Sequence, residues 1–153
     1  MMHNRIHTTQ ELLELLPQVL EAGGTLPLVI SGSSMAPFLI HSRDTVYLSK
    51  LRRPVNRGDM ILYRRQDGTL ILHRVWGMDA RGYSLLGDAQ THMESGVREE
   101  QFLAVVTAVN RKGKLLTPKS LIWLFFEKIW LRVIPLRRSV MACYDRIMSK
   151  RRL

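Results

Sequence analysis

The stretch MILYRRQDGTLILHRVW, residues 60–76, decides the fold class. Asp67-Gly68 separates two apolar runs in it, and an Asp-Gly pair in that position is a strong signal of a β-hairpin. Similar short runs, divided by turns that contain glycine, recur between residues 25 and 116. This spacing predicts a compact, mostly antiparallel β domain. The expected strands are Leu26–Ser31, Thr45–Ser49, Met60–Tyr63, Thr69–Trp76, Tyr83–Leu86 and Phe102–Asn110.

Helices are expected at both ends of this β region. Thr8 and Glu11 fit a capping box, and leucines at helical spacing follow them up to Gly23-Gly24, where the helix should end. After Pro118 the apolar residues again follow a helical period, with a break at Pro135. We therefore expect a mainly β fold with an N-terminal helix in residues 1–24, a β domain in residues 25–117 and a basic amphipathic helical tail in residues 118–153.

The net charge of +10 is concentrated in the tail. Residues 119–153 hold nine Lys and Arg against two acids, a balance of +7. Such a segment favours an anionic surface, and aromatic residues within a continuous apolar face favour lipid over nucleic acid. We expect residues 119–153 to contact an anionic membrane peripherally, with no nucleic acid partner. Packing of Trp123, Phe125, Phe126 and Trp130 into the core is the open alternative.

The composition also restricts compartment and cofactors. The single cysteine, Cys143, permits no internal disulfide, residues 1–10 lack the apolar core of a signal peptide, and no apolar run is long enough for a membrane span. These features predict a cytoplasmic protein, with or without peripheral membrane attachment. His41, His73 and His92 lack metal-ligand spacing, and no phosphate loop is present, so we expect no metal and no cofactor.

Candidate catalytic residues begin at the sequence SGSSMAPFL, residues 31–39, which directly follows an expected strand. A serine beside glycine at a strand end can meet converging N–H donors, as a nucleophilic serine requires. His73, in an otherwise apolar strand, is a candidate base because an imidazole titrates near neutral pH. Asp88 and Glu94 are candidates for the acid that fixes the histidine tautomer.

Four blocks in this order resemble the motifs of the signal peptidases, whose superfamily includes the self-cleaving SOS repressors. The blocks are Gly32-x-Ser34-Met35-x-Pro37, Gly58-Asp59, His73-Arg74-Val75 and Gly87-Asp88, and the resemblance covers residues 25–110. A histidine stands where the bacterial enzymes have a lysine base. In this respect the chain is similar to the endoplasmic-reticulum and archaeal branch, which works with Ser, His and Asp.

The resemblance implies a signal-peptidase-like β fold and a serine endopeptidase that acts on a peptide or protein substrate next to small residues. By position, Ser34 matches the nucleophile and His73 the base, with Asp88 as the group that orients His73 and Glu94 as a second candidate acid. Gly32, Met35, Pro37 and Asp59 match supporting motif positions. The alternative is a catalytically inactive domain of this type that serves as a membrane-associated binding or scaffolding module.

Overall fold

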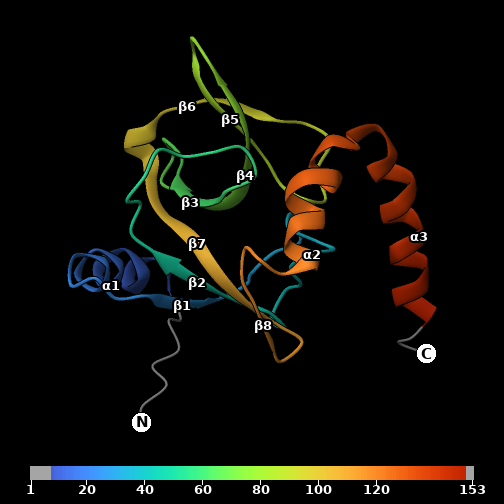
Figure 1. Ribbon diagram of the computed structural model, residues 1–153, viewed down its shortest axis with the longest axis horizontal. Coiled ribbons are helices and arrows are strands. Elements are labelled where there is room, and N and C mark those ends of the chain that lie inside the picture. The colour runs from blue at the N-terminus through green and yellow to red at the C-terminus, as the bar shows by residue number, and fades with distance from the viewer. Residues whose placement is uncertain (1–7, 151–153) are drawn as a thin grey trace.

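An eight-stranded antiparallel sheet forms the body of this computed structural model, which describes residues 8–150 (Figure 1). The strand order is β1-β2-β7-β3-β4-β5-β6, and β8 pairs with β7. The strands are β1 (Leu26–Val29), β2 (Thr45–Ser49), β3 (Met60–Arg64), β4 (Leu70–Asp79), β5 (Gly82–Leu86), β6 (Glu94–Val97), β7 (Phe102–Arg111) and β8 (Lys114–Leu116). The expected mainly β class, with an N-terminal helix and C-terminal helices, is confirmed. Residues 1–7 of the expected N-terminal segment and 151–153 of the tail lie outside the described residues.

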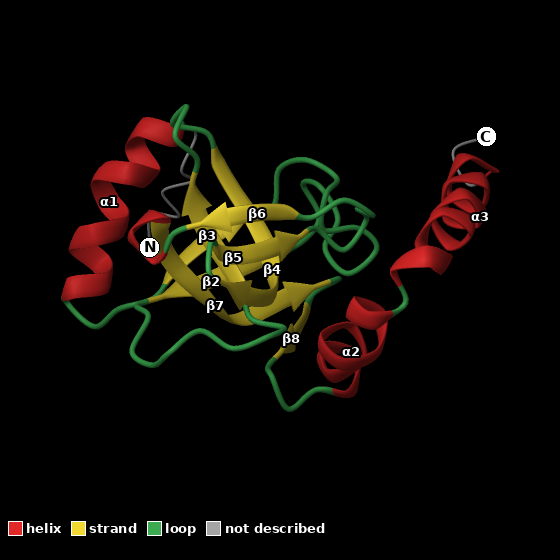
Figure 2. Ribbon diagram, turned by 90° about the horizontal axis from the view of Figure 1, so that it is seen from above, coloured by secondary structure: helices red, strands yellow, loops and turns green. Residues whose placement is uncertain are grey.

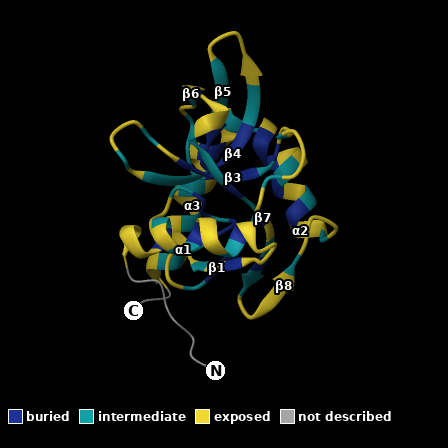
Figure 3. Cartoon of the chain, turned by 90° about the vertical axis from the view of Figure 1, so that its left-hand side faces the viewer, coloured by how far each residue is buried: buried dark blue, intermediate teal, exposed yellow. Residues whose placement is uncertain are grey.

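The N-terminal helix α1 (Thr9–Glu21) begins at the expected capping box. Thr8 Oγ1 accepts from the Glu11 backbone N–H at 3.1 Å, and the Glu11 carboxylate accepts from the Thr8 N–H at 3.3 Å. Leu12, Leu16 and Leu20 form the buried face of α1, and its opposite face is exposed (Figure 3). The helix thus covers one side of the sheet through an apolar stripe of helical period.

Two short strands and one short turn lie outside the sequence-based expectation. β6 and β8 are four and three residues long, and β6 contains Ser95 and Gly96, which are weak strand formers. Both strands pair with a longer neighbour that is already in place, β6 with β5 and β8 with β7. Their pairing with the sheet, more than their own composition, therefore makes them strands. A 3-10 turn, Glu99–Gln101, leads into β7.

Side chains on β3 and β4 divide between two apolar clusters. The first cluster contains Met60 and Leu62, and the second contains Ile61 and Tyr63. Successive side chains of a strand point to opposite faces, so the two clusters lie on the two sides of these strands. His73 pairs with Ile61 and Arg74 pairs with Met60, which places these adjacent residues on opposite sides.

The chain after β8 forms short helical segments and then one longer helix. They are α2 (Leu121–Leu124), a π-helical turn (Phe125–Ile129), two 3-10 turns (Trp130–Arg132 and Ile134–Leu136) and α3 (Arg137–Lys150). Figure 2 shows α2 and α3 at the opposite end of the sheet from α1. Three of the four aromatic residues of the packed-core alternative, Trp123, Phe126 and Trp130, are buried in the first cluster, whereas the fourth, Phe125, is exposed. Within residues 8–150, no helix has the length and apolar character that a bilayer crossing requires.

Candidate active site

The loop that carries Ser34 is fixed to the body by apolar side chains and by hydrogen bonds to its backbone. Met35 and Phe38 are buried in the first cluster. Arg111 donates from Nε to the carbonyl oxygen of Phe38 at 2.8 Å and from Nη2 to that of Pro37 at 3.2 Å. Gly32, with φ of +84°, adopts the left-handed conformation that favours glycine. The motif residues Gly32, Met35 and Pro37 therefore shape and hold this loop.

Ser34 is joined through its backbone to the turn formed by residues 87–90. The Ala89 N–H donates to the Ser34 carbonyl oxygen at 2.9 Å. A Cβ atom at Gly87 would overlap that same oxygen, so the close approach requires glycine. Among the hydrogen bonds of residues 8–150, none involves the hydroxyl or the N–H of Ser34. Ser34 is half-buried, and its hydroxyl has no hydrogen-bond partner among the described residues.

Asp88 does not orient His73, and this expectation was wrong. The carboxylate of Asp88 accepts from Nε and Nη2 of Arg74 at 3.0 Å each, and both side chains are fully buried. Arg74 also donates to the carbonyl oxygen of Gly58 at 3.0 Å. The reason lies in strand geometry: Arg74 and His73 point to opposite faces, and Asp88 lies on the Arg74 side.

A different acid lies on the side of His73. The Nδ1 atom of His73 is 3.3 Å from the Tyr63 hydroxyl, and that hydroxyl donates to the Glu94 carboxylate at 2.7 Å. Arg65 holds both oxygens of the same carboxylate at 2.7–3.0 Å. Glu94, the second candidate acid, is therefore linked to His73 through Tyr63.

The hydrogen-bond directions determine the tautomer of His73. Its burial lowers the pKa of the imidazole to about 4, so the ring is neutral at pH 7. Burial and the hydrogen bond to Glu94 raise the pKa of Tyr63, whose proton therefore stays in place, while Arg65 lowers the pKa of Glu94. Because the Tyr63 proton is donated to Glu94, the Tyr63 oxygen accepts from Nδ1–H of His73. Nε2 is then the unprotonated nitrogen, which can accept a proton.

The cavity beside His73, which we call the His73 cavity, has a volume of about 350 Å³. It is lined by Arg65, His73, Gln90, His92, Met93 and Glu94. Gln90 belongs to the same 87–90 turn that binds the Ser34 carbonyl, and its side-chain oxygen accepts from the Gly87 N–H at 3.1 Å. No hydrogen bond joins Ser34 to His73 among the described residues. The 87–90 turn thus binds the Ser34 backbone and contributes Gln90 to the cavity that His73 lines, but no hydrogen bond links the two candidate residues within residues 8–150.

Two side chains of the C-terminal tail donate hydrogen bonds to backbone carbonyl oxygens of this turn. Arg137, which is fully buried, donates to the carbonyl oxygens of Gly87 and Gln90 at 2.9 Å each. The indole N–H of Trp130 donates to the carbonyl oxygen of Asp88 at 2.8 Å. The tail is consequently a structural support of the candidate site as well as a basic segment.

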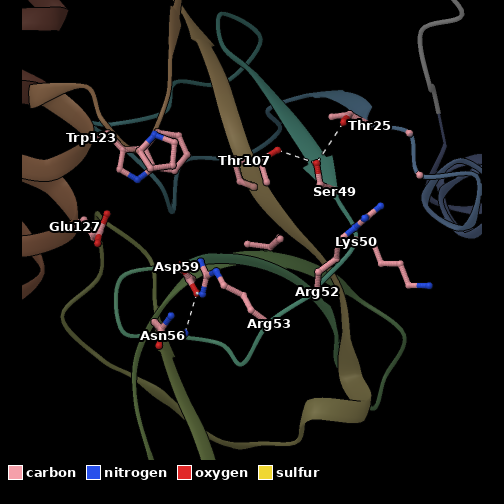
Figure 4. A pocket seen from close by; sticks show the side chains of 15 residues that line it. Thr25, Ser49, Lys50, Arg52, Arg53, Asn56, Asp59, Thr107, Trp123 and Glu127 are labelled. Atoms are coloured by element: carbon pink, nitrogen blue, oxygen red, sulfur yellow. Dashed lines mark hydrogen bonds and ion pairs between the residues drawn. The ribbon is translucent and has the colours of Figure 1, made fainter.

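Asp59 lies away from both Ser34 and His73. It accepts two hydrogen bonds of 2.9 Å from Arg53 and borders a separate cavity of about 600 Å³ (Figure 4). In that cavity the Ser49 hydroxyl lies 2.8 Å from the hydroxyl of Thr107 and 3.3 Å from that of Thr25. The role of Asp59 in this structure is therefore to hold the loop between β2 and β3.

Comparison of the chain with protein-family models, with curated proteins and with solved structures finds no match. Over residues 8–150, no group of three or more His, Cys, Asp and Glu side chains is placed to hold a metal ion. The functional argument therefore depends on the residues of the site.

Three residues of this site escaped the sequence analysis: Tyr63, Arg65 and Arg137. Tyr63 reads as one more apolar strand residue, since the sequence does not show that Glu94 will lie beside its hydroxyl. The available signal was the register of the expected hairpin. Ile61 pairs with His73 across the two strands, and Tyr63, two residues further along, lies on the same face as Ile61 and therefore on the same face as His73. Arg137 carried no such signal, because all its hydrogen-bond partners are backbone carbonyls, and the two in the 87–90 turn lie 50 and 47 residues away in the chain.

Proposed function

We propose that this protein is a serine endopeptidase of the signal-peptidase type, with Ser34 as nucleophile and His73 as general base. The observation that carries the proposal is the chain from His73 through Tyr63 to Glu94. This chain leaves Nε2 of a neutral imidazole free to accept a proton, and His73 lines a cavity together with Gln90 of the turn that binds the Ser34 backbone. Glu94, acting through Tyr63, takes the orienting role that the sequence had suggested for Asp88.

In the proposed reaction the Ser34 Oγ attacks a peptide carbonyl carbon while its proton passes to Nε2 of His73. The Ser34 N–H, which has no partner among the described residues, stabilises the resulting oxyanion. His73 then gives that proton to the leaving amine, the C–N bond breaks, and an acyl-serine remains. A water molecule, deprotonated by His73, hydrolyses the ester and restores Ser34. Preference for small residues next to the cut bond follows from the resemblance to the signal peptidases.

The reaction can come about only if Ser34 Oγ and His73 Nε2 approach each other when substrate binds. Catalytic hydrogen bonds are often long or absent in ligand-free enzymes and form in the substrate complex. The 87–90 turn binds the Ser34 backbone and borders the His73 cavity, so a movement of this turn is the means that we propose.

The test is covalent labelling of Ser34 with a fluorophosphonate, together with cleavage of a peptide library. We expect the wild type to be labelled and to cleave, and Ser34→Ala and His73→Asn to do neither while keeping their far-UV circular dichroism. Labelling that persists in Ser34→Ala would exclude this serine as the nucleophile.

A second candidate is an inactive signal-peptidase-like domain that acts as a membrane-associated scaffold. The capture of Asp88 by Arg74 and the missing contact between Ser34 and His73 favour it. Two results distinguish the candidates. The endopeptidase cleaves peptides and reacts with the fluorophosphonate, whereas the scaffold binds peptides without cleaving them and does not react with the fluorophosphonate.

We also propose that α3 contacts an anionic membrane, in the cytoplasm, where a free thiol at Cys143 is stable. Leu136, Val140, Cys143 and Ile147 form an exposed stripe at helical spacing, beside Arg146 and Lys150. Apolar residues next to cations suit the boundary between acyl chains and anionic headgroups.

The membrane contact is tested by flotation with phosphatidylserine-containing vesicles. Ile147→Glu should abolish flotation, whereas Ser139→Glu, which adds the same charge outside the stripe, should reduce it only slightly. Equal effects of the two substitutions would mean that net charge alone accounts for vesicle binding.

A further inference from the structure

A second hollow adjoins the His73 cavity and has a different chemical character. This hollow, which we call the arginine groove, has a volume of about 580 Å³. It is lined by Trp76, Thr91, His92, Arg132, Ile134, Pro135 and Arg138. His92 lines both hollows, so they meet at this residue. A chain bound beside His73 could therefore continue into the groove.

The groove is cationic and lacks carboxylates. No Asp or Glu lines it, and no ion pair within residues 8–150 involves Arg132 or Arg138. Arg132 donates only to the Lys128 carbonyl oxygen, at 2.6 Å, and Arg138 is exposed. A third guanidinium, that of Arg57, lies 3.9 Å from the ring centre of Trp76. Within the described part of the chain, none of these three guanidinium groups forms an ion pair with a carboxylate.

Trp76 lies at an irregularity of the sheet. The pairing of β4 with β5 shifts register between Val75 and Gly77, so Trp76 has no partner in the ladder. A bulge of this kind redirects a side chain, and bulges are common next to active sites. The indole borders the groove together with Ile134 and Pro135, and these three side chains give it an apolar wall beside its cations.

We propose that the arginine groove binds acidic side chains of the peptide substrate and thereby selects acidic substrates. This inference rests on the proposed endopeptidase function, because it treats the His73 cavity as the cleavage site. Guanidinium groups bind carboxylates through paired, charge-assisted hydrogen bonds. The apolar wall suits the aliphatic part of a glutamate or of its neighbours. A peptide is favoured over a nucleic acid because the groove shares its lining residue His92 with the cavity of the candidate base.

The test measures binding separately from cleavage, with Ser34→Ala protein and two fluorescein-labelled decapeptides. One decapeptide has an Ala-Gln-Ala centre flanked by glutamates, and its twin has glutamine at each glutamate position. By fluorescence anisotropy at low salt we expect the acidic peptide to bind about tenfold more tightly, a difference that added salt should reduce. Equal binding of the two peptides, or no binding of either, would overturn the inference.

Substitutions assign the effect to the groove. Arg138→Ala should remove most of the preference, while Arg146→Ala, which alters another exposed arginine of the same helix, should leave it unchanged. Arg138→Glu should reverse the preference, so that a twin peptide with lysine at each glutamate position binds more tightly than the acidic peptide. A reversed preference cannot result from misfolding, which would abolish binding of both peptides. Loss of preference in Arg146→Ala as well would indicate a general charge effect and contradict the groove.

Two further outcomes separate this inference from the proposed function. If Ser34→Ala prefers the acidic peptide but wild-type protein cuts neither peptide, the endopeptidase proposal fails and the groove stands as a binding site for acidic peptides. If a single-stranded oligonucleotide binds the groove more tightly than the acidic peptide and displaces it, the groove is a nucleic acid site and the inference is wrong.

Discussion

Nδ1 of His73 lies 3.3 Å from the hydroxyl of Tyr63, inside the second apolar cluster. The pair belongs to neighbouring strands, and the Tyr63 proton is committed to Glu94. The His73 imidazole is therefore positioned by the Tyr63 hydroxyl, and it is linked to the Glu94 carboxylate through that hydroxyl. Four predictions follow from this arrangement and from the turn beside it.

Tyr63→Phe should lower kcat by about 10- to 100-fold, because His73 loses the group that fixes its tautomer. KM should change little, since Tyr63 does not line the His73 cavity. Steady-state kinetics on a cleaved peptide checks this. The matched control is Tyr83→Phe, whose ring packs on Phe102 on the same side of the sheet. A Tyr63→Phe enzyme with wild-type kcat would remove Tyr63 from the positioning role.

The pH profile of kcat/KM should stay level from about pH 8 to about pH 5.5. It should then fall with a midpoint near the His73 pKa of about 4. An unperturbed histidine base would lose activity already near pH 6.5. Burial of His73 moves the loss to lower pH because a protonated ring would be poorly solvated. A midpoint near 6.5 would contradict this account of the base.

Stability should decrease as the pH falls from about 6.5 to about 4. The pKa of His73 in the folded protein, about 4, is below the value of about 6.5 expected after unfolding, so in this window the unfolded chain binds the extra proton. The contribution is fully present above pH 6.5 and amounts to at most about 3 kcal/mol. His73→Asn, which does not titrate, should therefore lose less stability than wild type between pH 7.5 and 4.5 in urea denaturation. Parallel losses would show that other groups dominate.

Asp88→Asn should destabilise the fold by about 3–5 kcal/mol, because it leaves the buried Arg74 without a counter-charge. The double variant Arg74→Met, Asp88→Leu should lose less than the sum of its single changes, since no buried charge remains. Chemical denaturation of wild type, Asp88→Asn, Arg74→Met, Asp88→Leu and the double variant measures these differences. Strict additivity would mean that the two side chains do not stabilise each other.

Much of the fold follows from local sequence. Asp67-Gly68 between apolar runs predicts the hairpin of β3 and β4, and Thr8 with Glu11 predicts where α1 begins. Both signals act within a few residues, so they do not depend on the rest of the chain. β6 and β8 differ in this respect. Each is too short to be recognised by composition and becomes a strand only by pairing with a longer neighbour.

The candidate site divides in the same way. The sequence by itself determined the candidates, namely a serine on a glycine-containing loop, a histidine in an apolar strand and two acids further on. Only the tertiary structure decided that Asp88 pairs with Arg74, that Glu94 reaches His73 through Tyr63 and that Arg137 holds the turn behind Ser34. The physical reason is that strand alternation assigns neighbouring residues to opposite faces, while strand order and register select the partners that each face meets.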